Sequence, residues 1–240
     1  MGAGRRWCCV LLAWLLWCGA PGAALRPFEA HYRLSRDGLP VGETRVRLER
    51  LPQDGYRYSA FTRPNALTGL WRDDLVEEVS EGDLVEGRPR PRYYSYHRHG
   101  GAPRALEIRF DWEEGRLRVS GDGGGWSARL PPGTLDKLVQ QWALSLDLAR
   151  TRPLPVGGPL VSYPVADGGR IKTYAYEIDA VEGEGTERRV RVRRSKDAGG
   201  TDYRLWFSPA RGWLPVRIER RYGGHLWRME LIGPDAAVAD

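Results

Sequence analysis

The stretch Glu43-Thr44-Arg45-Val46-Arg47-Leu48-Glu49 alternates strictly between charged side chains and the uncharged side chains of Thr44, Val46 and Leu48. Successive side chains of a β-strand point to opposite faces of a sheet, so this pattern predicts a strand with one buried and one solvated face. The same period of two returns at 106–112, 189–193 and 214–219. The repeated alternation therefore predicts a mainly β fold.

Pairs of turn-forming residues separate the alternating stretches. They are Asp37-Gly38, Asp54-Gly55, Glu114-Gly115, Asp167-Gly168 and Gly223-Gly224. Such pairs tolerate the positive φ angles that tight hairpin turns require. Short alternating strands joined by hairpins predict an antiparallel meander, which forms a curved sheet or an open barrel.

One segment has the periodicity of a helix instead. Its apolar residues recur at the spacing of a single helical face: Leu135, Leu138, Val139, Trp142 and Leu146. Thr134 follows a Pro-rich turn and is expected to cap the first turn. We therefore expect one amphipathic helix over about 134–149, which covers or plugs the open sheet.

The N-terminal residues have the layout of a secretory signal peptide. Arg5 and Arg6 precede a short apolar run over 7–17, and Gly22 and Ala24 occupy the −3 and −1 positions of a cleavage site. We expect cleavage after Ala24, which removes residues 1–24. The remaining chain is predicted to form one β-rich domain over 25–233, with a frayed tail at 234–240. This layout predicts a periplasmic protein.

The cysteines bear on both stability and membrane attachment. Cys8, Cys9 and Cys18 all lie in the predicted signal peptide, so the mature chain has no thiol and depends on apolar packing, to which seven tryptophans contribute. Lipidation requires a small residue directly before the cysteine, and Trp17 argues against a lipid anchor at Cys18. Because no second apolar run of about 18 residues follows, no transmembrane segment is expected in the mature chain.

The charge pattern argues against a nucleic-acid partner. The formal net charge is +6 at pH 7, and removal of Arg5 and Arg6 lowers it by two. Basic residues alternate with acidic ones along the predicted strands, as in 43–49. This arrangement is typical of a mixed solvated surface rather than a phosphate-binding patch.

The residues give little support to catalysis or to a metal site. His97 and His99 share one face of a predicted strand, a spacing that can hold one metal ion, but no third ligand is visible. An exposed, aromatic-rich strand end is the favoured explanation of the pair. Neither a Gly-x-Ser-x-Gly nucleophile motif nor a His-Glu-x-x-His zinc motif occurs. We therefore expect no catalytic residues, no metal and no cofactor.

Aromatic and histidine side chains are the candidate ligand-binding residues. They are Trp71, Tyr93, His97, His99, Trp112 and Trp142. A curved sheet lined by such residues, with a helix across its mouth, can enclose an apolar or amphipathic envelope ligand. The alternative is that the tryptophans fill the core. Two other functions stay open: an assembly module in cell-envelope biogenesis that pairs through strand edges, and, least favoured, a hydrolase of an envelope polymer.

The stretch Leu205–Ile218 resembles the most recognisable part of an uncharacterised bacterial envelope family, domain of unknown function 3108. In that family Trp, an apolar residue, a small residue and Pro precede Leu-Pro-Val-Arg. Here the corresponding residues are 206–209 and 214–217. Phe110-Asp111-Trp112, the segment 87–91 and the helix at 135–148 resemble further features of the family in the same order.

The resemblance extends over Phe28–Ile232 and implies an exported, mostly β protein with no established catalytic residues. It also suggests, by analogy of fold alone, an architecture similar to the open barrels of bacterial lipoprotein carriers. The motif has a physical explanation of its own. Ser208-Pro209 and Arg211-Gly212 are expected to form a turn between two strands, after which Trp213 and Leu214 return to the core.

Overall fold

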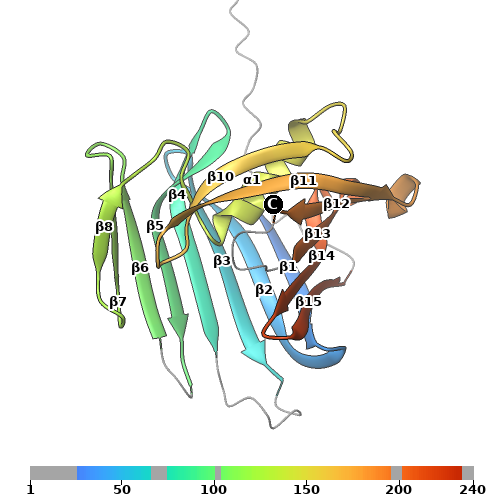
Figure 1. Ribbon diagram of the computed structural model, residues 1–240, viewed down its shortest axis with the longest axis horizontal. Coiled ribbons are helices and arrows are strands. Elements are labelled where there is room, and N and C mark those ends of the chain that lie inside the picture. The colour runs from blue at the N-terminus through green and yellow to red at the C-terminus, as the bar shows by residue number, and fades with distance from the viewer. Residues whose placement is uncertain (1–25, 66–74, 101–103, 196–201, 234–240) are drawn as a thin grey trace, which may run out of the picture.

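In the computed structural model, which describes residues 26–65, 75–100, 104–195 and 202–233, fifteen strands form one curved sheet (Figure 1). The strands are β1 (Phe28–Arg36), β2 (Leu39–Leu51), β3 (Gly55–Pro64), β4 (Val76–Val85), β5 (Arg88–Arg98), β6 (Arg104–Asp111), β7 (Arg116–Gly121), β8 (Trp126–Arg129), β9 (Leu135–Asp136), β10 (Pro159–Ala166), β11 (Ile171–Glu182), β12 (Arg189–Arg194), β13 (Tyr203–Ser208), β14 (Leu214–Tyr222) and β15 (His225–Ile232). Their order in the sheet is β8-β7-β6-β5-β4-β3-β2-β1-β15-β14-β13-β12-β11-β10-β9. Neighbouring strands are antiparallel, except that β9 and β10 run parallel. The predicted mainly β, antiparallel curved sheet is therefore confirmed.

The inner face of the sheet is the apolar face that the alternation predicts. Thr44, Val46 and Leu48 on β2 are buried, whereas Arg45 and Arg47 are exposed. On β12, across the sheet, Val190 and Val192 are fully buried. Each strand thus contributes every second side chain to the core and the others to solvent.

Hairpin turns lie where the sequence predicts them. Asp37 and Gly38 connect β1 to β2 with φ angles of 50° and 85°, and Gly223 and Gly224 connect β14 to β15 with 59° and 80°. Between β13 and β14 a short 3-10 helix at Pro209–Arg211 ends at Gly212, which has a φ of 63°. The predicted turn before Leu214 is confirmed.

The helix is confirmed, but it begins at Val139 rather than near Thr134. Helix α1 spans Val139–Arg150, and the preceding Leu135–Asp136 forms the edge strand β9, paired with β10. The Thr134 hydroxyl donates to the Pro131 carbonyl within a turn, so the predicted cap at Thr134 is wrong. Asp136 caps the helix instead, because its Oδ1 accepts from the backbone N–H groups of Leu138 and Val139 at 2.9 and 2.8 Å.

Helix α1 lies inside the curve of the sheet, where it contacts β5, β10 and β14 (Figure 1). The Trp142 ring meets the Tyr56 ring edge-on, with 5.2 Å between centroids. On the polar side of the helix, Gln140 accepts a hydrogen bond from the Tyr176 hydroxyl, and Asp147 accepts one from Tyr163 at 2.6 Å. The helix therefore plugs the sheet and is bound on both of its sides.

The two ends of the sheet meet where the β10–β11 turn crosses to β6 and β8. The indole N–H of Trp126 on β8 donates to the Gly168 carbonyl at 2.9 Å. Gly168 has a φ of 92°, and a Cβ there would come within 2.5 Å of the Leu106 side chain on β6. The close approach and the backbone conformation together require glycine at position 168. The Trp126–Gly168 hydrogen bond brings the two ends of the curved sheet together.

Two leucines on α1 test whether the helix packs on a filled core. Leu148 is fully buried, whereas Leu146 is half-buried. We expect Leu148→Ala to lower the free energy of unfolding by about 3 kcal/mol, because it leaves a cavity among packed side chains. The matched control Leu146→Ala should cost about 1 kcal/mol. Urea unfolding followed by tryptophan fluorescence measures both values, and equal losses would contradict a filled core beneath the helix.

Candidate functional site

Two of the predicted ligand-binding residues lie on the outer face of β5, and a third, His99, follows directly after the strand. Tyr93 and His97 alternate with the inward-facing Tyr94 and share the solvated side of the strand. The His97 and His99 rings stack with centroids 6.4 Å apart. Among the residues whose positions are given, no group of three His, Cys, Asp or Glu side chains could hold a metal ion.

The other predicted residues are dispersed. Trp112 lies at the β6–β7 turn, where its indole N–H donates to the Pro91 carbonyl at 2.7 Å. Trp142 projects from α1 and is 7% exposed, because its ring packs against the rings of Tyr56 and Tyr58. Trp71 lies outside the described residues. The described ones among these side chains are therefore not gathered into one site, and Trp142 is part of the buried core.

A small apolar cavity remains beside the helix. Its volume is about 70 Å³, and Leu135, Ala143, Leu146 and Tyr163 contribute to its lining. Ligand pockets generally measure about 300–1,000 Å³. This cavity is too small for an extended acyl chain.

A buried carboxylate fixes the helix to the sheet. Asp136 is fully buried, and besides capping α1 its Oδ2 accepts from the Ser80 hydroxyl on β4 at 2.6 Å. Ser80 in turn contacts the Tyr56 hydroxyl at 3.3 Å. Burial raises the pKa of Asp136 to about 6, against the lowering effect of its hydrogen bonds. Because Ser80 and Asp136 have no exposed surface, this network is structural and out of reach of a substrate.

Beyond the helix, the inner face carries what we call the inner cation–tyrosine cluster. Its members are Glu78, Tyr94, Tyr96, Lys137, Tyr174, Arg194, Tyr203 and Arg220. In its first half, Glu78 accepts from the Tyr94 hydroxyl at 2.6 Å and pairs with Lys137 at 3.1 Å. The Lys137 ammonium lies 4.1 Å from the centre of the Tyr96 ring. This half is thus an ion pair bordered by two tyrosine rings.

The second half of the cluster surrounds Arg194, the last residue of β12. Its guanidinium carbon lies 4.1 Å from the centre of the Tyr174 ring and 4.9 Å from that of Tyr203. Gln141 on α1 donates to the Tyr203 hydroxyl at 3.4 Å. Burial raises the pKa of Tyr203 to about 12, so this hydroxyl stays protonated at neutral pH.

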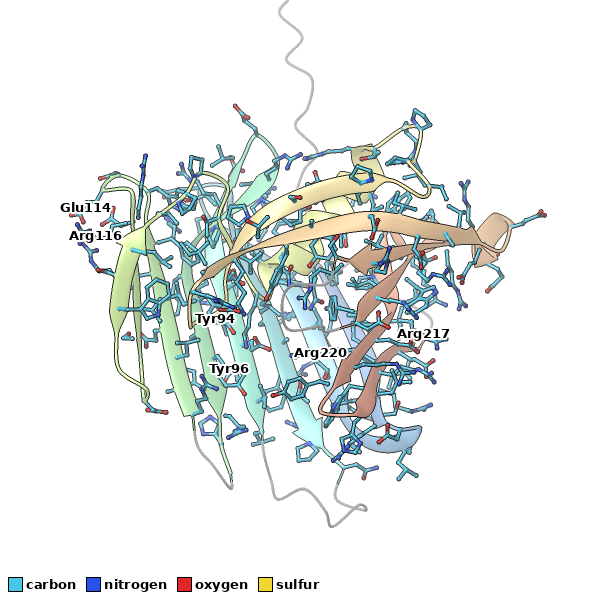
Figure 2. All side chains as sticks on the ribbon, viewed as in Figure 1. Tyr94, Tyr96, Glu114, Arg116, Arg217 and Arg220 are labelled. Atoms are coloured by element: carbon cyan, nitrogen blue, oxygen red, sulfur yellow. The ribbon has the colours of Figure 1, made fainter. Side chains whose placement is uncertain are left out.

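Figure 2 shows that the cluster is contributed by both sides of the curved sheet. Tyr94 and Tyr96 project from β5 on one side, and Arg220 projects from β14 on the other. Arg220 pairs in the sheet with Tyr203, which gives it the inward orientation of that ring. The cluster therefore brings cationic and aromatic groups together across the concave face.

This cluster is not apparent from residue types in the sequence, although part of its signal is present there. The alternation that makes Val190 and Val192 inward-facing also makes Arg194 inward-facing. On β5 the same parity separates Tyr94 and Tyr96 from Tyr93 and His97. The contacts of Tyr96 with Lys137 and of Arg194 with Tyr203 depend on the tertiary structure. The alternation along a single strand does not encode them.

The comparisons with known proteins give the chain a family. The family model described as Protein of unknown function (DUF3108) matches residues 27–229. The chain belongs to this family. No curated protein matches it.

A solved structure is similar in fold. The beta-barrel-like protein of domain of unknown function DUF1849 from Brucella abortus superposes with a TM-score of 0.59 at 12% sequence identity. The similarity covers 90% of this chain and 99% of that one. At this identity the likeness establishes the architecture alone. None of the helices within the described ranges has the length and apolar character needed to cross a bilayer.

The pKa of Asp136 predicts a specific pH dependence of stability. The folded-state pKa of about 6 exceeds the ordinary value of 3.8, so the folded protein binds the proton more tightly. The resulting stabilisation is complete below pH 3.8 and is lost as the pH rises through about 6, a change of about 3 kcal/mol. Asp136→Asn should lack this change.

Unfolding free energies of the wild type and Asp136→Asn between pH 4 and 7 check this prediction. The contributions of the other carboxyl groups are common to both proteins, so they cancel when one unfolding free energy is subtracted from the other. Between pH 4 and 7, the unfolding free energy of the variant should rise relative to that of the wild type by up to about 3 kcal/mol. Parallel profiles would show that burial does not raise the pKa of this carboxyl.

Proposed function

We propose that this protein is exported to the periplasm and binds an apolar or amphipathic ligand on the inner face of the sheet beyond α1. The observation that carries the proposal is the incomplete burial of that part of the face. Tyr96, Trp227 and Met229 point inward but are only half-buried, whereas Tyr56 and Tyr58 beside the helix are fully buried. A concave surface of aromatic and aliphatic groups with a few polar ones is typical of small-molecule sites.

The sheet edges favour a ligand-binding protein over an assembly module that adds strands from a partner. Strand addition requires an accessible edge with free backbone groups. The terminal strands of this sheet, β8 and β9, have four and two residues. Trp126 on β8 is also bonded to the β10–β11 turn. Short, covered edges are a common protection against such pairing.

Export is supported by the N-terminal sequence. The arginines Arg5 and Arg6, the apolar run over 7–17 and the small residues Gly22 and Ala24 together make a signal peptide. The absence of cysteine after residue 24 suits a protein whose folding requires no disulfide bonds.

Two tyrosines on β5 provide a matched test of the binding face. Tyr96 points into the concave face and Tyr93 points outward. We expect Tyr96→Ala to weaken binding of the uncharged apolar dye N-phenyl-1-naphthylamine about tenfold, because a ring that contacts the ligand is lost. Tyr93→Ala should bind as the wild type does. Dye fluorescence titration gives the dissociation constants.

The same titration can contradict the proposal in two ways. Loss of affinity in Tyr93→Ala alone would place the ligand on the outer face, with His97 and His99. Failure of the wild-type protein to bind the dye, together with native mass spectra showing no ligand in protein purified gently from the periplasm, would argue against ligand binding altogether.

Export has an equally direct test. Mass spectrometry of the protein recovered from a periplasmic fraction should show a mature chain that begins at Leu25, because cleavage follows Ala24. Replacement of Ala24 by arginine should leave the precursor uncleaved, since the −1 position accepts only small residues. Recovery of the full-length wild-type chain from the cytoplasm would contradict export.

A further inference from the structure

Arginines on the outer face of the sheet have carboxylate partners across the strands. On β12, Arg193 pairs with Glu177 at 2.6 Å, and Arg191 pairs with Asp179 and Glu182 at 2.8 and 2.6 Å. On β3, Arg57 pairs with Glu81 at 2.7 Å. These exposed pairs explain most of the arginine content of the strands as a solvated surface of mixed charge.

Arg194, next to Arg193 but on the inner face, differs from them in its surroundings. Its residue surface is 9% exposed, and within the described ranges no carboxylate pairs with it. Its Nε is buried without a hydrogen-bond partner. The Nε of Arg204 is also unbonded, but that guanidinium has a counter-charge in Asp202 at 3.1 Å. The described neighbours of Arg194 are thus tyrosines and not carboxylates: two rings lie over its guanidinium, and the Tyr176 side chain hydrogen-bonds to it.

Such a group is costly in a folded protein unless an anion neutralises it. Removing a charge from water without a partner costs several kcal/mol, and contacts with aromatic rings recover only part of this. The planar guanidinium also has a fork of N–H donors that fits the two oxygens of a carboxylate or phosphate. Its chemistry therefore matches an anion that is not part of the described chain.

We propose that Arg194, together with Lys137 and Arg220, binds the anionic headgroup of an amphiphilic ligand, a carboxylate or a phosphate, while the ligand's apolar chain lies along the inner face. This inference rests on the proposed function and adds the chemical class of the ligand. Lys137 is already paired with Glu78, and Arg220 has no carboxylate partner in the part of the chain described here. Glu78 and the neighbouring Asp136 are the carboxylates within electrostatic range of Tyr94, so the three cations leave the cluster with a net positive charge.

The geometry prepares Arg194 for this role before the ligand arrives. The rings of Tyr174 and Tyr203 fix the guanidinium from two sides, and Gln141 holds the Tyr203 hydroxyl. A donor group that is already ordered loses little conformational freedom on binding, which increases affinity. The half-buried Tyr96 and Met229 add apolar surface to the same face.

Isothermal titration calorimetry with three twelve-carbon probes tests the proposal on the mature protein. Dodecanoate and dodecyl phosphate have anionic headgroups, and dodecanol is the neutral control of the same chain length. The wild type should bind at least one anionic probe about tenfold more tightly than dodecanol. The stronger of the two anions identifies the ligand as a fatty acid type or a phospholipid type.

Variants at two adjacent positions localise the effect. Arg194→Met keeps an unbranched side chain without the charge and the N–H donors, and it should remove the preference for the anionic probes. Arg194→Lys should keep most of it. Arg193→Met, on the outer face of the same strand, is the matched control and should leave the preference unchanged.

The outcomes separate this inference from the function on which it rests. If the wild type binds dodecanol and both anions equally well, the headgroup site is wrong and the apolar binding face stands. If none of the three probes binds, both are wrong. If Arg194→Met does not fold, the wild type and Arg194→Lys still decide the matter, because equal affinities of either protein for all three probes would overturn the headgroup site.

Discussion

The buried carboxylate of Asp136 is the interaction on which the arrangement of the molecule depends. It caps α1 through two backbone N–H groups and accepts a hydrogen bond from Ser80 on β4, so a residue at the end of the sheet order is tied to a strand near the opposite end. A curved sheet alone would leave its inner face wet. Because Asp136 holds the helix inside the curve, the inner face beside α1 becomes a core.

Placing one helix of twelve residues inside a fifteen-stranded sheet divides the inner face, across the described residues, into two regions. Where α1 lies, Trp142, Tyr56 and Tyr58 fill the space, and the remaining cavity is about 70 Å³. Beyond the helix, no other helix of the described residues packs on the inner face of the strands (Figure 1). The inner cation–tyrosine cluster lies at this boundary, because Lys137 and Gln141 come from the start of the helix segment and the tyrosines come from the sheet.

Local patterns predicted the fold well because the energy that selects strands and turns is local. The period of two at 43–49 and the paired turn residues at Asp37-Gly38 depend only on neighbouring side chains and backbone angles. The start of the helix was misplaced for a tertiary reason. Leu135 has a helical spacing to Val139, but its pairing with Val165 in β10 outweighs that local preference.

The candidate site was harder to predict because its members come from distant parts of the chain. Ser80 and Asp136 are separated by 55 residues, and Lys137 meets Tyr96 only after β9 reaches the inner face. Residue type alone predicted ligand-binding roles for Trp142, which is a core residue, and for His97 and His99, which lie on the outer face. The parity of the strands is more informative than residue type here, because it separates Arg193, which faces Glu177, from Arg194, which faces the interior.

At position 194, the residue that would best stabilise the fold differs from the residue that would best bind an anion. Its inward neighbours Val190 and Val192 are fully buried, and an apolar side chain of similar volume between Tyr174 and Tyr203 would avoid the desolvation of a charge. The contacts with the two rings offset only part of that cost. An electrostatic interaction grows stronger as the surrounding dielectric falls, so the interior that makes an unpaired guanidinium costly also makes it an effective partner for an incoming anion. A residue that weakens the empty protein and strengthens its complex is the arrangement expected of a binding site rather than of a core.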